Sequence, residues 1–247
     1  MQYSIKKIIP NILTSLNFLS GCIAAYLAFN HFYLSTLLFC FLGVFFDFFD
    51  GYFARILKVE DQFGKHFDSL SDIITSGFVP GIIMYQLFLL SGVKEINYVI
   101  SIFETNFIFS IAPIGLIGFL ISLGAAYRLA NFNVIKTSNS FIGLPAPANS
   151  LLIVSLPVFL DYPLINQIKP FILSPYSLSI ISLISIFLMN VKWKMFKINF
   201  NRNTYLFPLI FIFLSIILIF FLKEAAITLS IICYLLLSLI KNIFNKD

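Results

Sequence analysis

The sequence predicts an all-α polytopic membrane protein, a bundle of about eight transmembrane helices with both termini on the cytoplasmic side. Composition gives the first reason: the 247 residues are 60% hydrophobic and 11% charged, with 31 Phe and a mean hydropathy of +0.97. A soluble domain carries about 25% charged residues, so these values indicate an integral membrane protein. The other two reasons are the number of apolar runs and the uneven distribution of Lys and Arg.

Eight stretches are apolar enough to be interpreted as spans, for which about 20 mostly apolar residues are needed. The first is expected to be a retained span and not a signal peptide, because no Ala-x-Ala-type cleavage site follows it. The fifth is short, and the segment Ser91–Asn106 is expected to be a polar loop. The predicted spans are Ile12–Asn30, Tyr33–Ala54, Phe67–Leu90, Phe107–Leu129, Pro147–Leu160, Phe171–Met189, Leu206–Leu222 and Ala225–Leu239.

The basic residues predict the orientation. Only Lys94, Lys169 and Lys223 fall on one side when the loops alternate, and the other 13 of the 16 Lys and Arg fall on the side of the termini. Positive loops stay in the cytoplasm, so a multi-pass protein of the cell membrane is expected, with its termini inside. This orientation also explains the net charge of +5, and no nucleic-acid partner is expected.

Four aspartates stand out in a chain that has only eleven Asp and Glu. Asp47 and Asp50 are three residues apart, and Asp68 and Asp72 are four apart, so each pair shares one face of a helix. The short turn Ile56–Phe63 between the two helices is expected to bring both pairs together at the cytoplasmic membrane surface.

Such a quartet predicts a metal site. An Asp near lipid costs ~2.5–3.5 kcal/mol on insertion scales, and clustered carboxylates repel one another unless cations lie between them. Oxygen-only ligands suit Mg²⁺ or Mn²⁺, so we expect a site for two such ions. The alternative is that both pairs are solvated helix ends, or are neutralised by Arg55, Lys58 and Lys65.

The spacing resembles a family pattern. Asp-x-x-Asp-Gly-x-x-Ala-Arg, then eight residues, then Gly-x-x-x-Asp-x-x-x-Asp is similar to the motif of the CDP-alcohol phosphatidyltransferases. The resemblance implies transfer of a phosphatidyl group from CDP-diacylglycerol to an alcohol, with release of CMP. It also implies that Asp72 is the base and that the other three Asp are the principal metal ligands. The motif positions are Asp47, Asp50, Gly51, Ala54, Arg55, Gly64, Asp68 and Asp72.

The resemblance further implies a site for the CDP-activated lipid. Gly51 and Ala54 lack bulk, which would let the nucleotide approach the helix, and Arg55 can pair with phosphate. Asn11 and Thr14 at the start of the first span lie near the nucleotide in related proteins. An equally simple interpretation is that these two side chains cap the helix or bond neighbouring helices. The expected donor-binding residues are Asn11, Thr14, Asp47, Gly51, Ala54 and Arg55.

Two later segments resemble the members of this family that use serine. The fourth span ends in Arg128-Leu-Ala-Asn-Phe-Asn133, and the loop Phe141-Ile-Gly-Leu-Pro-Ala-Pro-Ala148 follows. Asn131 stands where those members usually have a second Arg. The resemblance implies that Arg128 and Asn131 bind the serine; Arg128 could instead extend to lipid phosphates.

We therefore expect residues 1–160 to form the catalytic core, and residues 161–247 to add three more spans to the same membrane domain. L-serine, CDP-diacylglycerol and membrane lipids are the expected partners, and a homodimer is the expected assembly. The basic loop Lys192–Arg202 would suit anionic headgroups. Two alternatives stay open: the same transfer to glycerol phosphate or inositol phosphate, and a divalent-cation transporter. Sequence alone does not choose between acyl and ether lipid or between Mg²⁺ and Mn²⁺.

Overall fold

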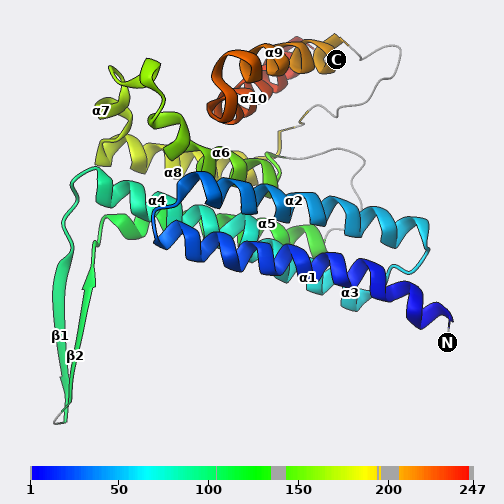
Figure 1. Cartoon of the computed structure of the whole chain (residues 1–247), viewed down its shortest axis with the longest axis horizontal. Coiled ribbons are helices and arrows are strands. Elements are labelled where there is room, and N and C mark those ends of the chain that lie inside the picture. The colour runs from blue at the N-terminus through cyan, green and yellow to red at the C-terminus, as the bar shows by residue number, and fades with distance from the viewer. Residues whose placement is uncertain (1, 104, 135–142, 194, 196–205, 245–247) are drawn as a thin grey trace.

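The computed structural model describes residues 2–103, 105–134, 143–193, 195 and 206–244, and most of them are helical (Figure 1). Within these ranges, five segments are long and apolar enough to cross a membrane, which confirms a multi-pass helical membrane protein. The count of eight spans and the side of the termini stay predictions. The five segments are Lys6–Phe29, Tyr33–Ile56, Gln62–Leu90, Gly115–Val134 and Phe207–Lys241, and the shorter apolar helices are Ala146–Leu160 and Pro175–Asn190.

The first two helices, α1 (Gln2–Phe29) and α2 (Tyr33–Ile56), pack side by side as an antiparallel pair (Figure 1). α1 begins ten residues before the predicted first span and continues through Pro10. This is tolerated because a proline removes a single helix hydrogen bond, here close to the helix end.

A long third segment follows, made of α3 (Gln62–Asp72), the π-helix η1 (Ile73–Phe78) and α4 (Val79–Leu90). A π-turn is wider than an α-turn and is common at functional sites. In η1 the carbonyl of Thr75 accepts a hydrogen bond from the hydroxyl of Ser150 at 2.9 Å. The neighbouring helices come very close to η1: a Cβ at Gly21 or at Gly43 would lie 2.6 Å from the Thr75 side chain.

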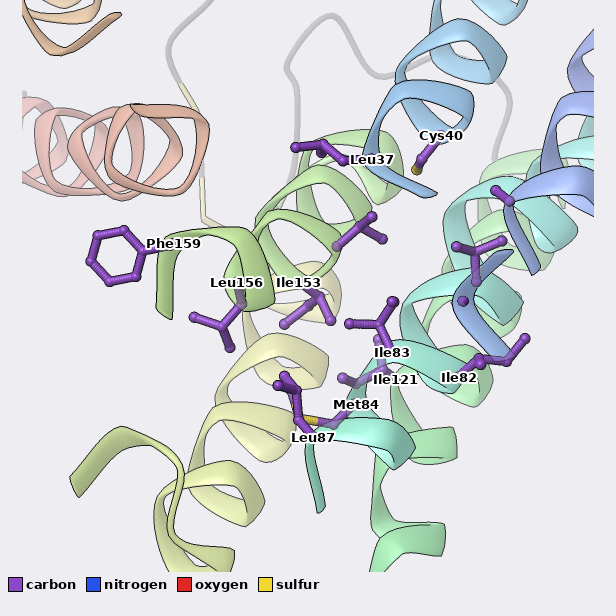
Figure 2. Packing of buried hydrophobic residues seen from close by; sticks show 14 of the residues in the cluster. Leu37, Cys40, Ile82, Ile83, Met84, Leu87, Ile121, Ile153, Leu156 and Phe159 are labelled. Atoms are coloured by element: carbon purple, nitrogen blue, oxygen red, sulfur yellow. The ribbon is translucent and has the colours of Figure 1, made fainter. Parts of the chain in front are cut away.

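α4 is the centre of the bundle, because nine of its twelve residues are buried. It packs against α1, α5 (Leu120–Val134), α6 (Ala146–Leu160) and α8 (Pro175–Asn190), and Figure 2 shows Ile82, Ile83, Met84 and Leu87 in this core. Helices that are apolar all round are buried ones. The outer helices differ, since each exposes a row of large apolar side chains toward the surrounding lipid. In α2 this row is Leu34, Leu38, Phe41, Phe45, Phe48 and Tyr52.

The structure corrects the start of the fourth predicted span. Phe107 lies in a strand and not in a helix: β1 (Ile96–Ile102) pairs with β2 (Thr105–Ile111) as an antiparallel hairpin, and helical structure begins only at η2 (Gly115–Phe119), before α5. The physical reason is Pro113, which ends the apolar run on its N-terminal side. The residues before it are mostly Ile, Val, Tyr, Phe and Thr, which favour strands.

The C-terminal part adds four helices. α8 (Pro175–Asn190) begins at Pro175 and not at the predicted Phe171, because Ser174 caps its first turn and accepts a hydrogen bond from the Ser177 amide. α9 and α10 fold back on each other (Figure 1), and α10 contacts α6, where the hydroxyls of Ser155 and Thr228 are 2.7 Å apart. The bounds are α7 (Lys169–Ile172), α9 (Leu206–Leu222) and α10 (Ala226–Phe244), with short 3₁₀ turns at η3 (Pro163–Ile165) and η4 (Lys223–Ala225).

Candidate active site

The turn between α2 and α3 is fixed by Asp61. Its carboxylate caps α3 by accepting from the Gly64 amide at 2.8 Å, and it accepts from the Lys7 ammonium of α1 at 2.7 Å. The Lys7 hydrogen bond, followed by the one from Gly64, lowers the pKa of Asp61 below its ordinary value. Gly64 suits this cap, because a Cβ there would lie 3.1 Å from the Asp61 Oδ1 atom. The cap therefore sets where α3 starts relative to α1 and α2.

This turn brings three of the four predicted aspartates together. One carboxylate oxygen each from Asp47, Asp50 and Asp68 lies within 4.8 Å of the others, so α2 and α3 present a compact acidic group. Asp50 is 4% exposed, and Asp47 and Asp68 are half-buried. Asp72, one helical turn beyond Asp68, lies outside this group.

The basic residues nearby do not neutralise the group. Among the described residues, the only salt bridges are Lys7–Asp61 and Lys169–Asp161. Lys65 donates instead to the carbonyl of Asn133 at 3.1 Å. In the described part of the chain, Arg55, Lys58 and Lys65 therefore form no salt bridge with the four aspartates, although the charge of Arg55 acts on Asp50.

The group fits a divalent cation. All its ligand atoms are carboxylate oxygens, which hard ions such as Mg²⁺ and Mn²⁺ prefer. Among the described residues, Asp68 Oδ1 is buried and has no hydrogen-bond partner. A buried polar atom without a partner is costly, and a cation at that atom would remove the cost. The fit therefore rests on both the donor set and the unpaired oxygen.

Two side chains of α1 hold the aspartates that face it. The Thr14 hydroxyl donates to Asp50 at 2.5 Å, and the Asn17 amide donates to Asp72 Oδ1 at 3.1 Å. The Asn17 amide is oriented in turn by Thr75 of η1, whose hydroxyl donates to Asn17 Oδ1 at 2.7 Å. Nothing in the sequence indicated Thr75. Since Thr75 lies in the π-turn, that turn helps to position Asp72.

The other predicted donor-binding residues lie around the acidic group. The guanidinium of Arg55 lies over Gly51, where an added Cβ would be 3.6 Å from its nearest nitrogen. Ala54 is half-buried on the same helix, and Asn11 lies near Gly64 of α3. α1, α2 and α3 thus bring all six expected donor-binding residues to one end of the bundle.

The end of α5 is attached to α3. The side-chain amide of Asn133 donates to the hydroxyl of Ser69 at 2.7 Å, and the Ser122 hydroxyl donates to the carbonyl of Gly77 at 2.8 Å. Arg128 lies between these two contacts along α5, so it is at about the level of Asp72. α5 therefore closes the same end of the bundle that carries the aspartates.

Arg128 joins α5 to the end of α8. Its Nη1 atom donates to the carbonyl of Met189, where a cation is favoured by the helix dipole. The loop that precedes α6 meets this corner as well, because the amide of Gly143 donates to the carbonyl of Trp193 at 2.9 Å. Gly143 has a φ of +67°, and a Cβ there would lie 2.6 Å from the Met189 carbonyl oxygen. Only glycine fits this position.

The structure thus unites the two segments whose sequence resembles the serine-using members: Arg128 and the Gly143 loop are in contact. Asn131 is half-buried on α5, almost one turn after Arg128. Phe141 and most of the basic stretch Lys192–Arg202 lie outside the described residues, so the predictions on them are untested.

Fold and site together define a class: a polytopic membrane protein with a buried carboxylate group at one end of its helices, suited to a divalent cation. Comparison with known sequences gives the family. The CDP-alcohol phosphatidyltransferase sequence model matches residues 7–240, and the chain belongs to this family. It is therefore an enzyme that carries out phosphotransfer. This excludes the alternative that the chain is a divalent-cation transporter.

Curated proteins that are similar to this chain agree with this family. The chain is 28% identical to a CDP-diacylglycerol–serine O-phosphatidyltransferase of Helicobacter pylori, over 96% of this chain and 95% of that protein. It is 34% identical to a protein of the same name from Methanocaldococcus jannaschii, over 68% of this chain and 70% of that protein. An archaetidylserine synthase of Methanothermobacter thermautotrophicus is 33% identical over 60% of this chain.

Proposed function

We propose that this protein transfers the phosphatidyl group of CDP-diacylglycerol to the hydroxyl of L-serine, which gives phosphatidylserine and CMP. The observation that carries the proposal is the group of Asp47, Asp50 and Asp68, whose oxygens lie within 4.8 Å in a membrane enzyme of this family. The names of the similar proteins support serine as the acceptor and a CDP-activated lipid as the donor.

Asp47, Asp50 and Asp68 would hold the divalent ions, Mg²⁺ or Mn²⁺, with Asp72 next to them. When bound, such ions cover the negative charge of the diphosphate and stabilise the charge that develops in phosphoryl transfer. The remaining donor contacts come from the chain itself. Arg55 pairs with phosphate, and the small side chains at positions 51 and 54 leave space for the nucleotide beside α2. Asn11 and Thr14 border the same space.

Asp72 takes the proton of the attacking hydroxyl. Serine's hydroxyl is a weak nucleophile near neutral pH and needs a general base. The serine oxygen forms a bond to the phosphorus that bears diacylglycerol, the bond from this phosphorus to the CMP oxygen breaks, and the proton moves to Asp72. Asp72 is 8% exposed, and its carboxylate is oriented by the hydrogen bond from Asn17. Its position is therefore fixed by contacts inside the bundle.

Replacing Thr75 with Val should lower kcat roughly tenfold while the KM for both substrates changes little. Val keeps the shape but removes the hydroxyl that orients Asn17, and an unpaired buried acceptor costs ~1–3 kcal/mol. The matched control is Thr75→Ser, which keeps the donor and should restore most of kcat. Steady-state kinetics on both variants in one detergent checks this. Equal losses in Val and Ser would show that Thr75 matters through packing alone.

Arg128 would bind the serine carboxylate. Its guanidinium has five N–H donors in a planar fork, and one of them bonds the carbonyl of Met189. Asn131 lies on the same helix and could accept from the serine ammonium. A phosphorylated acceptor would need a denser basic cluster than Arg128 and the exposed Lys192 provide in the described part of this corner. This favours serine over glycerol phosphate and inositol phosphate.

The experiment that tests the proposal is an acceptor panel. Purified protein is given CDP-diacylglycerol with serine, glycerol phosphate or inositol phosphate in parallel, and CMP release is measured. We expect release with serine and little with the other two. Preference for a phosphorylated acceptor would overturn the choice of serine and keep the family reaction. An ether-linked donor in the same panel would decide the lipid type.

The acidic end is proposed to face the cytoplasm, because 13 of the 16 basic residues fall on that side. In a background whose native cysteines are replaced, Lys94→Cys should react with an impermeant thiol reagent in intact cells, and Glu60→Cys should react only after lysis. Both positions are exposed, so accessibility is matched. The reverse labelling pattern would put the active site outside. The homodimer stays a prediction.

A further inference from the structure

The β1–β2 hairpin begins and ends at one face of the membrane. It follows α4, which ends at Leu90, and precedes η2, which begins at Gly115, and both are ends of segments able to span a membrane. The acidic group lies at the other end of the bundle, where α2 ends and α3 begins. In Figure 1 the hairpin projects at a steep angle to α1 and α2 and extends beyond the bundle. A hairpin in this position runs along the membrane surface.

The hairpin is amphipathic, which its register makes clear. In an antiparallel pair, directly opposite residues share a face and successive residues alternate. One face carries the pairs that begin with Ile96, Tyr98, Ile100 and Ile102, and seven of its eight residues are apolar. The other carries Asn97, Ser101, Asn106 and Ser110 around one apolar pair. The apolar face consists of Ile96, Tyr98, Ile100, Ile102, Thr105, Phe107, Phe109 and Ile111.

Nothing in the described chain covers the apolar face. Every residue of both strands is exposed except Ile111, which is half-buried. The base is nevertheless held in place, because Tyr85 of α4 accepts from the Ala112 amide at 3.1 Å and donates to Glu95 at 3.3 Å. Tyr98 and Phe109 stack with ring centroids 5.6 Å apart. A two-stranded hairpin is only marginally stable in water, so a surface that covers one face would stabilise it.

The size and the edges of the hairpin indicate which surface this is. Seven residues per strand give a face of about 23 Å by 10 Å, or roughly 230 Å², from a rise of ~3.3 Å and a strand spacing of ~4.8 Å. A standard protein interface takes roughly 20–30 residues a side, so the eight residues of this face alone would not hold a second copy. Both edges carry unpaired backbone groups, which excludes the hydrocarbon core. The boundary between headgroups and acyl chains meets both requirements, and aromatic residues concentrate there.

We propose that the β1–β2 hairpin is an interfacial anchor. Its apolar face lies on the acyl-chain boundary of the leaflet opposite the acidic group, and its polar face meets headgroups and water. The strands contain no charged residue, while Lys94 and Glu95 precede them at the edge of the bundle. This inference is independent of the reaction that the acidic group performs.

Tryptophan fluorescence tests the anchor with matched variants. The single native tryptophan is removed by Trp193→Phe, and a new one is placed by Tyr98→Trp on the apolar face or by Val99→Trp on the polar face. These neighbours lie on the same strand, so only the face differs. In nanodiscs of phosphatidylcholine with brominated acyl chains, we expect Trp at 98 to be quenched several-fold more than Trp at 99, with bluer emission. Acrylamide should show the reverse order.

The pair Phe109→Trp and Ile108→Trp repeats the test on β2, in case the first pair disturbs the fold. Circular dichroism and thermal unfolding check that each variant is intact. Equal weak quenching by brominated lipid at both faces would show that the hairpin stands in water. Equal strong quenching would show that it is immersed in acyl chains, and protection of Trp at 98 from both quenchers would show a protein partner. Each of these results would overturn the proposal.

Discussion

Replacing Asp68 with Asn should abolish transfer while the protein still folds and inserts. Asp68 Oδ1 is a buried oxygen without a hydrogen-bond partner among the described residues, and one carboxylate oxygen of Asp68 lies within 4.8 Å of Asp47 and Asp50. Losing several kcal/mol of charge stabilisation in the transition state corresponds to roughly a thousandfold or more in kcat. Chelation by EDTA should have the same effect on the unmodified protein, and Mg²⁺ or Mn²⁺ should reverse it.

Thermal unfolding gives a second measurement that does not depend on turnover. The midpoint of the unmodified protein should rise with Mg²⁺ or Mn²⁺, because a ligand that binds only the folded state stabilises it. Asp68→Asn should unfold no earlier than the unmodified protein in EDTA, since one of three repelling charges is gone, and should respond less to metal. Asp161→Asn is the control, because its exposed pair with Lys169 is worth only ~0–1 kcal/mol. Full activity in EDTA would refute the metal site.

Replacing Arg128 with Lys should raise the KM for serine roughly ten- to a hundredfold. Lysine keeps the charge but loses the planar fork, and lost charge-assisted hydrogen bonds are worth ~1.5–3 kcal/mol. The KM for CDP-diacylglycerol should change little. A lysine can still bond the carbonyl of Met189, so the end of α8 should stay in place and the unfolding temperature should change little.

Both constants should be measured on one preparation of Arg128→Lys. A higher KM for the lipid donor with an unchanged KM for serine would show that Arg128 contacts lipid phosphate. If neither KM changes while the variant unfolds at a lower temperature, the role of Arg128 is to hold the end of α8. Trp193→Phe is a suitable control, because the residue contributes its backbone carbonyl to this corner and that atom is kept.

Much of the acidic site could be predicted from the sequence, because helical spacing and a short turn are local properties. The pairs three and four residues apart, with eight residues between Arg55 and Gly64, are enough to bring Asp47, Asp50 and Asp68 together. The separate position of Asp72 was not predictable. It depends on the α1 side chain of Asn17, 55 residues away, and on a π-turn that the sequence pattern does not indicate.

The hairpin shows how an apolar run can mislead. Phe107–Ile111 was apolar enough to be included in a span, although Pro113 separates it from the helix that follows. The alternation of apolar residues with Asn and Ser from Ile96 to Ile102 was a strand signal, since its period is two. The Met189 partner of Arg128 had no such signal, because contacts between distant helices depend on how the whole bundle packs.

Serine labelled with ¹⁸O in its hydroxyl group tests the central claim most directly. The purified protein is incubated with this serine, CDP-diacylglycerol and Mg²⁺ or Mn²⁺, and both products are analysed by mass spectrometry. If the serine oxygen attacks the phosphorus that bears diacylglycerol, the label appears in the serine-containing lipid and the CMP is unlabelled. A labelled CMP, or CMP release with no serine-containing lipid, would contradict the account.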